Sequence, residues 1–87
     1  MRFSDVFVSR EDRYSIATEL ESGRHYVAIP VSNGLVGYEE YYVISPEQFD
    51  EFLSDRSAAI EFVEACRQHQ YDDLLILKPG TNRGTPV

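Results

Sequence analysis

The feature that most constrains the fold of this chain is the Asn-Gly pair at Asn33-Gly34, which has β-favouring residues on both sides. Asn-Gly suits the centre of a type I′ turn, where both residues need positive φ, and such turns join antiparallel strands. We therefore expect a hairpin over residues 24–45 with a two-residue turn at its centre. That register places Ile29 opposite Tyr38 and His25 opposite Tyr42.

A second hairpin is expected just before the first. Apolar and polar residues alternate from Tyr14 to Leu20, and Ser22-Gly23 predicts a two-residue turn that sets Ile16 opposite Ile29. A slip of one residue in either hairpin would scatter the apolar residues over both faces of the sheet. Instead, the two independently placed turns gather them on one face, which we predict to be the core face: Tyr14, Ile16, Leu20, Val27, Ile29, Val31, Val36, Tyr38, Tyr42 and Ile44.

The remaining segments predict one more strand before the hairpins, two helices after them and a final strand. Phe3 to Val8 indicates the first strand. Ser45-Pro46-Glu47-Gln48 has the serine cap, first-turn proline and glutamine of a capping box, so a helix begins there. A second helix, capped by Ser54 or Asp55, runs to about His69, and Leu74-Leu75-Ile76-Leu77 predicts a buried strand.

The predicted fold class is therefore α+β: a largely antiparallel β-meander of four to five strands with two helices packed on one face. Residues 1–80 are expected to form one small domain and residues 81–87 a mobile C-terminal tail. Pro30, which would face Gly37, lacks a ladder donor, so we expect a β-bulge at that pair.

The charge of the chain excludes several classes of partner. Residues 39–73 hold ten acidic and two basic residues (−8), residues 1–38 sum to −1 and residues 74–87 to +2, which gives the net −7. No basic stripe is present for nucleic acid or for an anionic membrane. No apolar run spans a bilayer and no secretory signal is evident, and the single cysteine, Cys66, fits a reducing compartment. We expect a cytoplasmic protein.

Candidate catalytic and metal-binding groups are few. In the expected register Glu40 falls on the core face diagonal to His25, where a carboxylate needs a partner such as His25 or Tyr42, and a His25–Glu40 pair could act as general acid and base. The interpretation that we favour is that the bulge at Pro30 turns Glu40 to solvent, or that Glu40 sits at the open end of the sheet. Cys66 and His69 are three residues apart on a helix, but no third group completes a zinc or nucleophile site, so Cys66 is expected to be a buried thiol. Residues 78–84 lack the Walker pattern. We expect no enzymatic activity, no cofactor and no metal.

The face of the sheet opposite the core is the predicted binding surface. In the expected register Tyr26 and Tyr41 lie directly opposite each other, with small residues beside them and carboxylates at the rim. Paired tyrosines on such a face indicate either a protein interface, self-association included, or an ordinary antiparallel sheet with one solvated face, where tyrosine is also common. The predicted partner-binding residues are Glu19, Tyr26, Glu39, Tyr41 and Val43.

Three functional hypotheses follow from these residues, of which the one we do not favour is a small enzyme that uses His25 and Glu40. The first is a small acidic protein-binding domain that acts through the Tyr26/Tyr41 face or through the acidic outer faces of the helices. By analogy of size and charge it would be a bacterial inhibitor of the immunity or antitoxin type that neutralises a basic protein. The outer helix faces carry Glu47, Asp50, Glu51, Glu61 and Glu64, for which a solvated surface is the usual meaning. The alternative is a homodimeric structural or regulatory domain that self-associates through the open sheet face.

Overall fold

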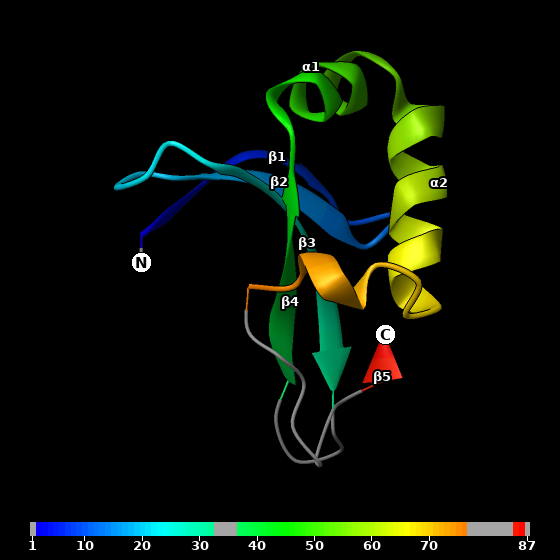
Figure 1. Cartoon of the computed structure of the whole chain (residues 1–87). Coiled ribbons are helices and arrows are strands. Elements are labelled where there is room, and N and C mark those ends of the chain that lie inside the picture. Colours follow the sequence, from blue (N-terminus) through cyan, green and yellow to red (C-terminus); the bar gives the residue numbers. More distant parts are fainter. Residues whose placement is uncertain (1, 33–36, 77–84, 87) are drawn as a thin grey trace.

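The computed structural model describes residues 2–32, 37–76 and 85–86. Its elements are β1 (Phe3–Ser9), β2 (Tyr14–Glu19), β3 (His25–Ser32), β4 (Gly37–Ile44), α1 (Pro46–Ser54), α2 (Arg56–Arg67), the 3₁₀ helix η1 (Asp72–Leu74) and β5 (Thr85–Pro86). The four longer strands form an antiparallel sheet in the order β1-β2-β3-β4, and both α-helices pack on one face of it (Figure 1). The predicted α+β fold is confirmed.

Both predicted hairpin registers are wrong by two residues. Ile29 lies opposite Glu40, not Tyr38, and Ile16 lies opposite Val27, not Ile29. The connection after β2 is longer than two residues: Glu19 N donates to Arg24 O, and Gly23, at φ 75°, donates to Glu19 O. The turn predicted at residues 33–34 lies outside the described residues. A shift of two preserves the alternation of side chains, so the assignment of residues to the two faces survives.

The predicted core face is buried, with two exceptions. Leu20 is 57 % exposed because β2 ends at Glu19, and Tyr38, near the start of β4, is 37 % exposed. Val36 lies outside the described residues. The core between sheet and helices contains Tyr14, Ile16, Val27, Ile29, Val31, Tyr42, Ile44, Phe52, Ala59, Phe62, Val63, Cys66 and Leu75.

The bulge predicted at Pro30 and Gly37 is also wrong. Pro30 pairs with Glu39 in an uninterrupted β3–β4 ladder. It lies between the β2 and β5 pairings along the other edge of β3, a position where a strand can lack an amide donor. With no bulge to shift the register, Glu40 stays on the core face and is 7 % exposed, so our favoured expectation that it turns to solvent is wrong.

The irregularity of the sheet lies instead in β1. The β1–β2 register shifts between Asp5 and Phe7, so Val6 is the extra residue. Phe3 pairs with Glu19 on one face, whereas Phe7 pairs with Ile16 on the helical face. In a regular strand two residues four apart share a face. The bulge therefore lets β1 supply a phenylalanine to each face of the sheet.

The two helices begin as the sequence predicts. Ser45 and Gln48 form the capping box of α1, and the Asp55 carboxylate accepts from Ser57 N and Ala58 N at the start of α2. After α2, His69 takes a left-handed conformation with φ 62°, and the amides of His69 and Gln70 close the helix end on Cys66 O and Ala65 O. Neither α1 nor α2 has both the length and the apolarity to cross a membrane, and the rest of the described chain adds no other candidate.

The chain after α2 returns to the sheet, but not as the predicted strand. In place of a strand from Leu74, η1 is followed by a single bridge between Leu75 and Tyr42, with Ile76 N donating to Tyr41 O. Leu77 lies outside the described residues. Within the segment predicted as a mobile tail, β5 pairs with β3 at Val31 and Ser32.

Candidate functional site

The sheet face predicted to be an open binding surface is covered at its centre. Tyr26 is 5 % exposed, because Phe3 from β1 lies over it: the Phe3 ring meets Tyr26 edge-on, with centroids 5.4 Å apart, and stacks on Tyr41 at 4.1 Å. Tyr26 and Tyr41 are also diagonal neighbours 6.5 Å apart, not directly opposite. Because β1 and β4 are the two ends of the strand order, this contact shows that the sheet curls over the face.

Three of the predicted binding residues remain at least partly accessible: Glu39, Tyr41 and Val43. Burial is the main cause that raises the pKa of Tyr41 to about 12, and a hydrogen bond with Glu39 and the charges of Glu39 and Asp5 add to it. Tyr41 and Phe3 are half-buried against the buried Tyr26, so this aromatic cluster covers the centre of the face, and Glu39 and Val43 stay accessible beside it.

Glu19, another predicted binding residue, is a structural carboxylate. It is 4 % exposed and accepts hydrogen bonds from the amides of Glu21 and Ser22, each at 2.9 Å, and of Arg2 at 3.2 Å. These bonds, that of Glu21 first, lower the pKa of Glu19 to about 2. The carboxylate closes the turn after β2 and anchors the N-terminal segment.

Glu40 is buried with the partner that its position required. The Tyr42 hydroxyl, fully buried, donates to Glu40 Oε1 at 3.0 Å and lies 3.3 Å from Cys66 O. His25 is elsewhere: it lies opposite Ile44, stacks on Phe49 at 3.8 Å and shares a hydrogen bond with Thr18. Glu40 lies opposite Ile29, which is four residues from His25 on β3, or about 13 Å along the strand. His25 and Glu40 therefore do not form an acid–base pair.

Cys66 and His69 do not form a reactive pair either. Cys66 is fully buried, and burial, followed by the charges of Asp72 and Glu40, raises the pKa of its thiol to about 12. His69 is exposed beyond the end of α2. Among the residues that the structure describes, no three histidine, cysteine or carboxylate side chains are grouped as a metal site would need. Residues 78–84, which lack the Walker pattern, lie outside the described residues.

Arg56 and Arg67, the two basic residues within residues 39–73, bind α2 to the β1–β2 hairpin. Arg56 pairs with Glu11 and Asp12, and Arg67 donates to the carbonyl oxygens of Asp12 and Arg13 while pairing with Glu64. Their acceptors on the hairpin are more than 40 residues away in sequence, so no local pattern could have identified these contacts.

With both arginines engaged there, the outer side of the helices is left strongly acidic. We call the five exposed carboxylates of α1 and α2 the acidic helical layer: Glu47, Asp50, Glu51, Glu61 and Glu64. Of these, only Glu64 takes part in an ion pair with a residue that the structure describes. The sequence predicts that these carboxylates lie on the outer helix faces, as a solvated surface or as a candidate binding face, but it does not predict where Arg56 and Arg67 form their contacts.

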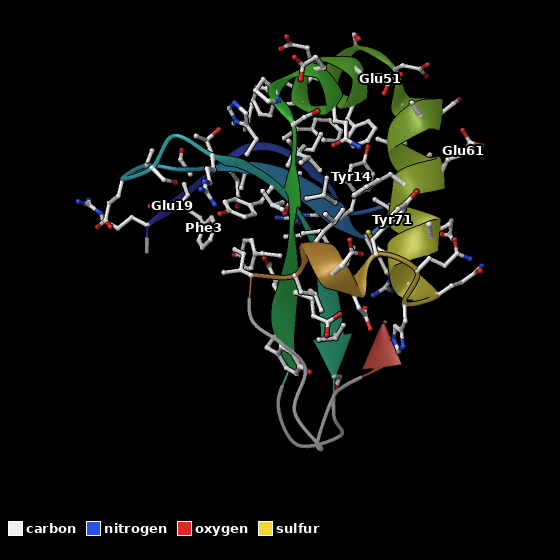
Figure 2. All side chains as sticks on the ribbon, viewed as in Figure 1. Phe3, Tyr14, Glu19, Glu51, Glu61 and Tyr71 are labelled. Atoms are coloured by element: carbon white, nitrogen blue, oxygen red, sulfur yellow. The ribbon has the colours of Figure 1, made fainter. Side chains whose placement is uncertain are left out.

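A surface groove lies within this layer, with a volume of about 390 Å³. Glu51 and Phe52 of α1, Glu61 and Phe62 of α2, and Tyr71 from the segment after α2 line it. Figure 2 shows Phe3 and Glu19 at one end of the molecule, well away from Glu51, Glu61 and Tyr71 on the helical side. The sequence missed the groove because Tyr71 reaches it only through the tertiary packing of the chain after α2.

The described side chains thus offer an acidic helical surface with a groove that Phe52, Phe62 and Tyr71 help to line. The sequence matches no protein-family model, and no curated protein or solved structure resembles the chain closely enough to count as a match.

Proposed function

We propose that this chain is a non-enzymatic binding domain whose partner is a basic protein, and that the acidic helical layer is the surface that meets it. The observation that carries the proposal is that Glu47, Asp50, Glu51 and Glu61 are exposed without an ion pair among the described residues, while Arg56 and Arg67 are both directed at the hairpin. Four like charges on two adjoining helices repel each other, so they favour a partner that supplies positive charge.

A bacterial inhibitor of the immunity or antitoxin type, acting in the cytoplasm on a basic toxin, is the form of this function that best fits an 87-residue chain of net charge −7. An acidic surface accelerates encounter with a basic partner and excludes acidic ones, including nucleic acids. The two helices that carry the charges are capped at their N-termini and packed on the sheet, so the surface is formed before the partner arrives.

The test is coexpression of the chain with the proteins encoded by its neighbouring reading frames. We expect one basic protein to copurify, with an affinity that falls about tenfold or more between 0.1 M and 0.5 M salt because the contact is electrostatic. The variant Glu47→Gln/Asp50→Asn should weaken binding, whereas Asp5→Asn/Glu21→Gln, which removes the same charge from exposed sites outside the helices, should not. Equal losses in both variants, or an affinity independent of salt, would contradict the proposal.

Self-association is a second candidate, now favoured by β1 and no longer by the tyrosine face. Val6, Phe7 and Val8 are 50 %, 39 % and 54 % exposed on a strand that, among the described residues, pairs only with β2. Exposed apolar edge strands are templates for pairing with another chain. Light scattering at high micromolar concentration should show a dimer that Val8→Lys disrupts and Leu20→Lys, an exposed site outside β1, leaves intact. A monomeric wild type would refute this candidate.

A further inference from the structure

We infer that the groove between α1, α2 and Tyr71 holds the side chain of an arginine from the basic partner. The inference rests on the proposed function, because it assigns one anchor point within the acidic helical layer. The inference goes beyond the proposed function because it names one groove and one kind of side chain that binds there.

The groove has an aromatic lining. Phe52 and Phe62 are 5 % and 7 % exposed, with ring centroids 5.2 Å apart, and Tyr71 stacks on Phe62 at 5.0 Å with an interplanar angle of 16°. Tyr71 is itself 37 % exposed. Since Phe62 packs against one side of the Tyr71 ring, the exposed part of the ring is available to a group that enters the groove.

The groove is also negatively charged. Glu51 comes from α1 and Glu61 from α2, both are exposed, and neither pairs with a basic side chain in the described part of the molecule. Glu51 stands in the last turn of α1, where the helix has no basic residue and where the carbonyl ends of the helix add further negative potential. A cation that enters the groove would reduce the repulsion between Glu51 and Glu61 and the repulsion between Glu51 and the carbonyl end of α1.

Arginine fits these two features together better than other cations do. Its guanidinium is planar, stacks on aromatic rings and donates several hydrogen bonds, so it can lie against Tyr71 while bonding to carboxylates. A lysine ammonium is a compact, strongly hydrated point charge that gains less from an aromatic lining. A calcium or magnesium ion needs six or more oxygen ligands, and only two of the side chains that line this groove, Glu51 and Glu61, are carboxylates.

The test begins with a small probe, N-acetyl-arginine amide, titrated into the ¹⁵N-labelled chain and followed by NMR. We expect shifts confined to the backbone amides of Glu51, Phe52, Glu61, Phe62 and Tyr71, with a dissociation constant of about 1–10 mM. N-acetyl-lysine amide should bind about threefold more weakly or worse. Equal affinity for the two probes, or shifts spread over every exposed carboxylate, would overturn the inference.

Variants then locate the site. Tyr71→Leu, and separately Glu51→Gln/Glu61→Gln, should each weaken the arginine probe about tenfold. Asp5→Asn/Glu21→Gln removes the same charge from exposed sites outside the helices and should change the affinity by less than about threefold. Because the carboxylate variant keeps the aromatic packing intact, it tests the groove even if Tyr71→Leu unfolds the chain.

The two proposals fail in different ways. A basic protein that binds the groove variants as tightly as the wild type, and binds Glu47→Gln/Asp50→Asn more weakly, would leave the proposed function standing and refute the groove as its anchor. An arginine probe that binds the groove in a chain for which no neighbouring gene product binds would support the groove and count against the proposed function.

Discussion

The burial of Glu40 is the point at which the prediction from sequence and the structure disagree most clearly. A carboxylate on a core face costs stability unless hydrogen bonds satisfy its oxygens. Tyr42 provides one at 3.0 Å, from a ring with no exposed surface. Removing the hydroxyl therefore leaves a buried acceptor short of a donor and does more harm than losing an exposed hydroxyl.

Tyr42→Phe should accordingly lower the free energy of unfolding by about 1–3 kcal/mol. The measurement is urea denaturation at neutral pH, with Tyr71→Phe, which removes a hydroxyl from a 37 % exposed ring, as the control. If the two variants lost equal stability, the Tyr42–Glu40 hydrogen bond would contribute nothing specific.

Because the pKa of Glu19 is lowered, we expect the stability of the fold to fall at acidic pH. Its pKa in the folded chain is about 2, below the ordinary value of 4.5, because backbone amides bind the ionised form. A lowered pKa stabilises the fold above pH 4.5, and this contribution is lost as the pH falls toward 2. Glu19→Gln should thus be less stable than the wild type at neutral pH, and the difference should shrink over that range.

The control for Glu19 is Glu21→Gln, an exposed carboxylate in the same turn. Its difference from the wild type should stay small from neutral pH to pH 2. A Glu19→Gln difference that remained constant over the same range would show that the stabilisation does not come from the ionised carboxylate.

At the scale of the elements, β1 decides whether the second face of the sheet is open. The bulge at Val6 turns Phe3 toward Tyr26 and Tyr41 while Phe7 stays on the helical face beside Tyr14. Local patterns predicted the capping box at Ser45 and the division of the hairpin residues into two faces, since both depend on nearest neighbours. They could not predict the covering of Tyr26, because this depends on a bulge and on the curl of the whole sheet.

Phe3→Ala tests that role of β1. It should lower the free energy of unfolding by about 1–3 kcal/mol and should return the pKa of Tyr41 from about 12 toward 10, because burial is the largest cause of its rise. An NMR titration of the Tyr41 ring gives the pKa directly. Phe7→Ala, from the same strand but the other face, should cost stability and leave the pKa of Tyr41 unchanged. A shift of the Tyr41 pKa in both variants would mean that general loosening, not cover by Phe3, is responsible.

At the scale of the whole molecule, the fold separates its charges. The composition already shows that residues 39–73 are acidic, but it does not show that Arg56 and Arg67 turn toward the hairpin and leave the outer helical side uncompensated. That arrangement depends on where Glu11 and Asp12 lie in three dimensions. The acidic helical layer is therefore a property of the tertiary structure, and it has a cost that can be measured.

The cost should appear as a trade-off between stability and binding at Glu51 and Glu61. Glu51→Gln/Glu61→Gln changes the net charge from −7 to −5 and removes a carboxylate from the last turn of α1, where the helix dipole disfavours it. We expect the variant to gain about 0.3–1 kcal/mol in the free energy of unfolding at low salt. High salt should narrow this gain, because it screens the repulsion in the wild type.

Urea denaturation at low and high salt measures the gain, with Asp5→Asn/Glu21→Gln as the charge-matched control. The same Glu51→Gln/Glu61→Gln variant should bind the arginine probe and the basic partner more weakly, so one substitution pair moves stability and affinity in opposite directions. If Glu51 and Glu61 were needed for folding, their substitution would instead lower stability and affinity together. A variant that is less stable than the wild type would therefore place Glu51 and Glu61 among the structural groups of the chain and remove the argument for the groove as a binding site.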